Sequence, residues 1–129
     1  MSTLIGVDHL PAAERFAFWR EAAARALGRL EYHTEDESGF WGRLHCGELG
    51  AVRVRRLEMT DFTARRTPAL IRPSDQDLLT LIMLLRGRGG IAQGQRQATL
   101  APAEFAVVET TRVPMRCARS MGACTRGFC

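Results

Sequence analysis

The sequence contains no lysine: all 18 of its basic residues are arginine. It also has no run of 18 or more apolar residues, which a transmembrane helix would need. The N-terminal stretch MSTLIGVDHLPAAERF lacks the basic leader and the apolar core of a secretory signal peptide. These absences argue against a spanning helix and against secretion, so we expect a cytoplasmic protein without membrane contacts. At 129 residues, the chain has the length of one ordinary domain.

The last part of the chain has no acidic residue, and this determines the net charge of +4. Residues 1–110 contain 14 Arg and 14 Asp plus Glu, so they are neutral as a whole. The excess comes from Arg112, Arg116, Arg119 and Arg126. A DNA-binding domain would show a basic footprint on its body. We therefore expect no direct nucleic-acid binding by this chain and assign it no DNA-binding residues.

Patterns typical of metal sites and catalytic sites are missing as well. The three histidines are His9, His33 and His45, and no two of them form an HxH pair. Three of the four cysteines lie near the C-terminus at spacings that differ from a CxxC knuckle; the four are Cys46, Cys117, Cys124 and Cys129. No G-x-S-x-G elbow occurs, and no Ser or Cys stands in a sequence context that suggests an activating His. We predict no metal ligands, no cofactor and no catalytic residues, and hence a protein that is not an enzyme.

What the sequence does contain begins with an amphipathic helix over residues 11–27. Pro11 suits a first helical turn, and Gly28 lies where a left-handed C-cap is expected. Apolar residues recur between them at spacings of three and four, which predicts one buried face: Ala12, Phe16, Trp19, Ala23 and Ala26.

After Gly28 the apolar period changes to about two, and turn residues recur every eight to twelve positions, which favours strands. The acidic segment 31–39 reads as a solvated loop between the first two strands. From Asp77 a nearly unbroken apolar run suits a strand covered on both faces, although a buried helix would give the same pattern. A hairpin with Gln93-Gly94-Gln95 at its turn and an alternating strand EFAVVETT follow. The predicted strands before Asp77 cover residues 30–33, 40–46, 51–57 and 61–66.

These elements predict a mainly β fold: a small barrel or jelly roll preceded by one amphipathic helix. Such a fold often encloses a cavity, but the chemistry inside must be argued separately.

Three separated motifs resemble a known family. LPAAERFAFWREA at 10–22, RRTPALI at 65–71 and LLRGRGGIAQGQRQATLAPAEFAVVETTRVP at 84–114 are similar to the N-terminal, cupin-like regulatory domain of AraC-type transcriptional regulators, in the subgroup with an AraC-binding-like domain. The resemblance covers residues 8 to about 114. The last motif departs from the family pattern, with Glu109 at an acidic position and Val113 inserted before Pro114.

The resemblance implies a cupin-like (jelly-roll) barrel that binds a small effector or holds a homodimer, while a separate C-terminal helix-turn-helix half binds DNA. We expect the regulatory domain to cover residues 1–115 and residues 116–129 to form an atypical basic, Cys-containing tail. On this basis the barrel is incomplete at its C-terminus and truncated before the DNA-binding half. Loss of the closing strands would expose the apolar faces of Leu81, Met83, Val107 and Val108.

Two hypotheses therefore remain open: the effector-sensing or dimerising domain of an AraC-type regulator, and a freestanding metal-free cupin that binds or converts a small molecule. For an effector pocket we single out Trp41 as a stacking surface, Arg66 as a fixed charge and Met83 as an adaptable apolar wall.

Overall fold

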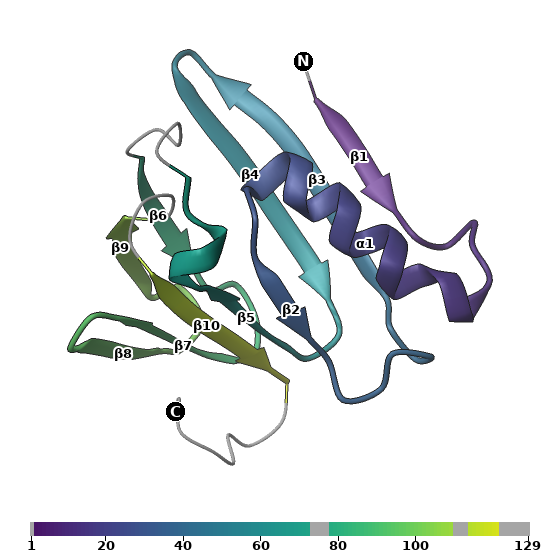
Figure 1. Ribbon diagram of the computed structural model, residues 1–129. Helices are drawn as coiled ribbons and strands as arrows, with labels where there is room; N and C mark the ends of the chain where they lie inside the picture. The colour runs from purple at the N-terminus through teal and green to yellow at the C-terminus, as the bar shows by residue number, and fades with distance from the viewer. Residues whose placement is uncertain (1, 73–77, 110–113, 122–129) are drawn as a thin grey trace. The chain divides into compact units, whose positions relative to one another are not determined.

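The chain is mainly β with one α-helix near its N-terminus, in a computed structural model that describes residues 2–72, 78–109 and 114–121 (Figure 1). The helical elements are α1 (Ala12–Leu27) and the 3-10 helix η1 (Pro68–Leu70). The strands are β1 (Thr3–Gly6), β2 (Glu31–His33), β3 (Gly42–Leu49), β4 (Val52–Met59), β5 (Phe62–Arg66), β6 (Leu79–Met83), β7 (Arg88–Gln93), β8 (Arg96–Leu100), β9 (Phe105–Glu109) and β10 (Met115–Ser120). No helix within these ranges is long and apolar enough to cross a membrane.

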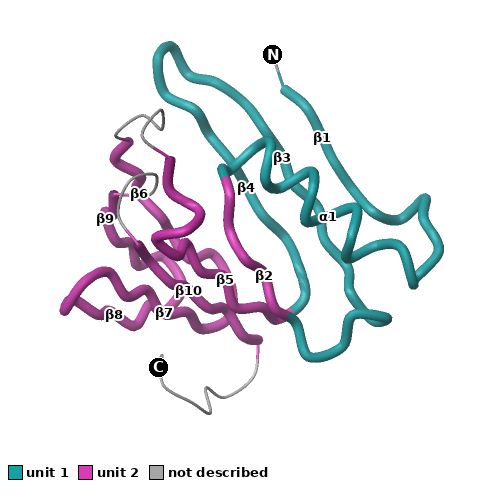
Figure 2. The backbone as a smooth tube through the Cα atoms, viewed as in Figure 1, with its two compact units in different colours: residues 1–28, 34–60 teal, residues 29–33, 61–129 magenta. Residues whose placement is uncertain are grey.

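The chain divides into two compact units, coloured separately in Figure 2. Unit 1 consists of residues 1–28 and 34–60, and unit 2 of residues 29–33 and 61–129. Strand β2 therefore lies in unit 2, although its neighbours along the chain belong to unit 1.

Unit 1 is built around α1, which begins and ends as the sequence predicts. Pro11 precedes its first residue, and Gly28 ends it at φ 88°, a conformation that glycine adopts without strain. The amide of Gly28 donates a hydrogen bond to the carbonyl oxygen of Ala24, which closes the last turn. The buried face consists of Phe16, Trp19, Ala22 and Ala23. Two members of the predicted stripe are more accessible, since Ala12 is exposed and Ala26 is half-buried.

Helix α1 covers one face of an antiparallel sheet with the order β1-β3-β4 (Figure 1). Trp19 and Leu44 are fully buried there, and Phe40 packs between Trp19 and Phe16 with ring centroids 5.7 Å and 5.2 Å away. Gly42 lies directly under the Trp19 ring: a Cβ at this position would be 2.9 Å from Trp19 Cε3. The close approach of helix and strand thus depends on glycine at position 42.

Unit 2 contains an antiparallel sheet with the order β2-β5-β10-β7-β8. Strand β10 lies between β5 and β7, with Met115 opposite Arg66 and Cys117 opposite both Ala64 and Ile91. The sequence predicts an atypical tail over residues 116–129, yet residues 116–120 belong to this strand. MRCARS has no β-branched residue, and its pairing comes from the strands on either side rather than from its own propensity. Of the other tail residues, 122–129 lie outside the described ranges.

Strands β6 and β9 form a separate two-stranded ribbon in unit 2. One side of the ribbon carries Val108 and Ile82 into a core with Leu84, Ile91, Leu100 and Met115. The other side is exposed, which differs from the expectation of a strand covered on both faces. Its members are Leu79, Leu81, Met83, Phe105 and Val107. Three of the four residues expected to expose apolar surface do so, whereas Val108 is 6% exposed.

Glycine in the LRGRG motif allows β10 to approach closely. Gly87 has φ 81°, and a Cβ there would lie 2.5 Å from the carbonyl oxygen of Ser120 at the end of β10. Any side chain at position 87 would therefore collide with backbone. This part of the motif has an architectural role.

Candidate functional site

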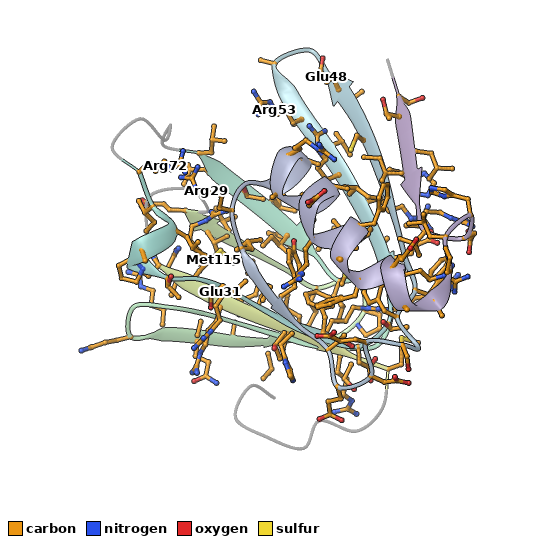
Figure 3. The ribbon with its side chains drawn as sticks, turned by 45° about the vertical axis from the view of Figure 1, so that its right-hand side comes forward. Arg29, Glu31, Glu48, Arg53, Arg72 and Met115 are labelled. Atoms are coloured by element: carbon orange, nitrogen blue, oxygen red, sulfur yellow. The ribbon has the colours of Figure 1, made fainter. Side chains whose placement is uncertain are left out.

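Arg66 is the most deeply buried charged side chain among the described residues, with 3% of its surface exposed. It ends β5, in the middle of the RRTPALI motif, and lies opposite Met115 of β10. Its Nε donates a hydrogen bond to the carbonyl oxygen of Arg29, 3.1 Å away. Arg29 in turn donates from Nε to the carbonyl oxygen of Leu70 in η1. The motif thus fixes a guanidinium group inside unit 2; Figure 3 labels Arg29 and Met115 there.

Tyr32 and Cys117 are the titratable neighbours of Arg66. Burial raises the pKa of the Tyr32 hydroxyl above its ordinary value and raises the pKa of the Cys117 thiol to about 11. The positive charge of Arg66 acts in the opposite direction on the pKa of both groups. Both side chains are therefore neutral near pH 7, and Arg66 is the permanent charge of this cluster.

Trp41 belongs to unit 1 and is already engaged there. Its Nε1 donates a hydrogen bond to Asp8 Oδ1, 2.7 Å away, and the guanidinium of Arg43 lies 5.2 Å from its ring centroid. Arg43 also pairs with Asp8 at 3.6 Å. Trp41 therefore stacks on a cation of its own unit, and its role in ligand binding stays a prediction.

Met83 lies at the end of β6, on the exposed side of the ribbon and opposite Phe105. Arg66 is buried, whereas Met83 is 48% exposed. A pocket that contains both side chains stays a prediction.

A groove in unit 1, of about 390 Å³, was not anticipated from the sequence. Its walls come from β1, α1, β3 and β4, and its lining residues are Thr3, Ile5, Phe18, Ala22, Arg25, Ala26, Cys46 and Arg55. Ala22 and Ala26 are four positions apart, so two small side chains lie one above the other on the helix and leave space. That spacing was the signal available in the sequence, although the predicted stripe contains Ala26 and not Ala22.

Arg55 is held rigidly at this groove. Its Nε donates to the carbonyl oxygen of Ala26 at 3.3 Å, and its Nη1 donates to those of Gly47 at 3.1 Å and Val54 at 3.0 Å. The side chain thereby satisfies a carbonyl in the last turn of α1, where the helix has no partner of its own. Val52 and Val54, which alternate with the arginines along β4, are exposed.

Within residues 2–72, 78–109 and 114–121, no three His, Cys, Asp or Glu side chains come together as a ligand set. His45 lies 4.0 Å from Glu58, which also pairs with Arg56 at 3.3 Å. The Arg56–Glu58 ion pair lies within β4, whereas His45 contacts Glu58 from the neighbouring strand β3.

Residues 19–121 match the model of the AraC-binding-like domain family. An uncharacterized protein in the nit 5′ region of Bacillus sp. (strain OxB-1) is 26% identical over 112 residues, which are 87% of this chain and 43% of that protein. The crystal structure of the AraC-like transcriptional activator CuxR superimposes with a TM-score of 0.70 at 20% identity, over 93% of this chain and 47% of that one. The chain thus spans less than half the length of both proteins.

Proposed function

Since the chain belongs to the AraC-binding-like domain family, we propose that it is the effector-sensing and dimerising domain of an AraC-type transcriptional regulator. Regulators of this type join such a domain to a DNA-binding half. The lengths of the relatives support this proposal, because this chain corresponds to 43% of one and 47% of the other. The cupin-like fold supports the same role.

The observation that carries the effector-sensing role is the buried guanidinium of Arg66. A buried charge is costly to maintain, so its presence marks a polar centre inside an otherwise apolar unit. Tyr32 adds a neutral hydroxyl and Cys117 a neutral thiol close to it. We infer that an effector with an anionic or hydrogen-bond-accepting group is oriented by Arg66. Trp41 and Met83 are kept as secondary predictions for ligand contact.

Thermal melts with a panel of small organic acids and their neutral isosteres test this role. We expect one class of acid to raise the Tm of the wild-type chain and to lose this effect in Arg66→Gln. Arg65→Gln is the matched control, because Arg65 is adjacent, exposed and paired with Glu31 at 3.2 Å. Arg66→Lys keeps the charge and should retain part of the shift.

A stabilising ligand that acts equally on wild type and Arg66→Gln would contradict the role of Arg66. If a ligand is converted to a product, the alternative of a freestanding cupin enzyme would be favoured instead.

We also propose that the domain acts in the cytoplasm, is not an enzyme, and does not bind nucleic acid directly. The neutrality of residues 1–110, which leaves most of the chain without a basic footprint, supports the last point. The isolated chain should show only weak DNA binding that disappears as salt is raised, because few counterions can be released. Sequence-specific binding at physiological salt in an electrophoretic mobility shift would contradict this expectation.

A further inference from the structure

The groove between α1 and the β1-β3-β4 sheet combines two arginines with an apolar floor. We propose that it binds a small organic carboxylate with a compact apolar body. This site lies entirely within unit 1 and does not involve Arg66, so the proposal does not rest on the effector role of unit 2.

The apolar part of the groove is formed by the methyl groups of Ala22 and Ala26, the ring of Phe18, the side chain of Ile5 and the Cys46 thiol. Its volume of about 390 Å³ lies near the lower end of small-molecule sites, which span roughly 300–1,000 Å³. An apolar body of the size of a benzene ring or a short alkyl chain fits this space.

The polar part of the groove is cationic. Arg25 and Arg55 are its two charged lining residues, and no Asp or Glu is among the residues that line it. Arg55 uses Nε and Nη1 for three carbonyl oxygens, and none of these bonds involves its Nη2. A guanidinium that is already oriented loses little entropy when it binds an anion.

Arg25 supplies the second cation, in the last turn of α1. It is exposed, and no ion pair with Glu21, four residues earlier, occurs in the described part of the helix. Its planar fork is therefore available for the two oxygens of a carboxylate, a geometry that charge-assisted hydrogen bonds favour. Glu48 and Arg53 lie opposite each other two residues further along the β3–β4 hairpin, and neither lines the groove (Figure 3).

Benzoate and hexanoate are suitable probes, with benzamide and inorganic phosphate as controls that lack the charge or the apolar body. Binding is measured by isothermal titration calorimetry to the full chain. In parallel, alkylation of Cys46 by iodoacetamide is followed on its own peptide by mass spectrometry. We expect the carboxylates to bind with a Kd about tenfold or more below that of either control. We also expect them to slow the alkylation of Cys46.

Two substitutions test the two halves of the groove. Arg25→Gln removes the available cation, and Ala26→Leu fills the apolar part without changing charge; each should weaken benzoate binding about tenfold. Arg53→Gln is the matched control, since Arg53 is an exposed arginine on the same strand as Arg55 but outside the lining. Melts of all three variants establish that they fold.

Equal binding of benzamide and benzoate, or equal losses in Arg25→Gln and Arg53→Gln, would overturn the proposal. So would unchanged alkylation of Cys46 at saturating benzoate. If benzoate binding is instead lost in Arg66→Gln and the Cys46 rate is unaffected, the groove is not the site while the proposed effector role stands. Absence of carboxylate binding altogether would reject the groove and leave other effector classes for unit 2.

Discussion

At the residue scale, the cluster of Arg66, Tyr32 and Cys117 shows how burial and charge oppose each other within one unit. Burial is the larger effect, because the pKa of both neutral groups lies above its ordinary value despite the adjacent guanidinium. A thiol with a pKa of about 11 is a poor nucleophile at neutral pH. Cys117 therefore belongs to the inert cysteines of protein interiors.

The Cys117 pKa predicts how stability depends on pH. In the unfolded chain the thiol ionises near 9.0, whereas in the folded chain it retains its proton up to about 11. The unfolded state thus binds fewer protons in this window, so stability is fully present below pH 9 and falls as pH rises toward 11. We expect a loss of about 2 kcal/mol from this group by pH 10.5, measured by urea unfolding between pH 7.5 and 10.5.

Cys117→Ala serves as the control, because it should remove the part of the slope that comes from the thiol. Arg66→Met should move the pKa of Cys117 further upward, since the guanidinium lowers it. A slope that is identical in wild type and Cys117→Ala would show that the thiol is already ionised in the folded chain or is not buried.

Gly42 and Gly47 form a natural pair for a second prediction, because both lie in β3 but meet different surroundings. A methyl group at position 42 would be 2.9 Å from Trp19 and 3.0 Å from Phe40, whereas nothing lies within 4 Å of one at position 47. We expect Gly42→Ala to destabilise by about 1–3 kcal/mol through overpacking. Gly47→Ala should be neutral or stabilising by about 0.5 kcal/mol. Urea unfolding of both variants, with Trp fluorescence as the signal, measures the difference, and equal effects would mean that helix and strand are not closely packed.

At the element scale, prediction from sequence succeeded where local signals coincide with burial. Pro11 and Gly28 delimit α1 to within one residue, and Gly94 at φ 62° makes the predicted β7–β8 turn. It failed for β1 and β10. The short TLIG of β1 is made a strand by pairing with β3, and MRCARS of β10 by β5 and β7.

The candidate sites were harder to predict than the elements. Arg66 stands out in the sequence only through the RRTP motif. Its burial depends on β2 and β10, which are both more than 30 residues away from it along the chain. The sequence pattern did not single out Arg55 as a site residue. Its position at the groove follows from the side of the sheet that α1 covers, which a pattern of period two does not specify.

The exposed side of the β6–β9 ribbon predicts self-association of the domain. Leu79, Leu81, Met83, Phe105 and Val107 together present roughly 500 Å² of apolar surface, at the upper end of what monomers expose. A standard interface needs about 800 Å² per partner, so this face would supply more than half of it. A second copy could use the same face in an isologous contact. We expect a concentration-dependent dimer in sedimentation velocity that Leu81→Lys weakens at least tenfold.

Thr63→Lys is the control for that experiment. Thr63 is an exposed strand residue outside the ribbon, so this substitution adds the same charge at a different place. A monomer at all concentrations, or equal loss of the dimer in both variants, would refute the role of the ribbon.

At the scale of the whole molecule, β10 determines whether the five-stranded sheet can be completed. A chain that ends at Pro114 would leave β5 and β7 without the strand between them, and with it both rows of ladder hydrogen bonds. We expect this chain to lose its cooperative thermal melt, whereas a chain that ends at Met121 retains it. Circular dichroism melts decide the matter, and a cooperative melt of the shorter chain would mean that β5 and β7 need no bridging strand.

The position of β10 also has a consequence for synthesis on the ribosome. Unit 1 is made entirely from the first 60 residues, so its helix and three strands can assemble while the rest is still being translated. The middle strand of the unit 2 sheet is encoded after the other four, so β5 and β7 must each wait with one open edge until residue 120 has left the exit tunnel. During this interval the nascent chain exposes the strand edges and apolar side chains that chaperones bind. A pause in translation before codon 115 would therefore lower the yield of folded protein more than an equal pause before codon 30.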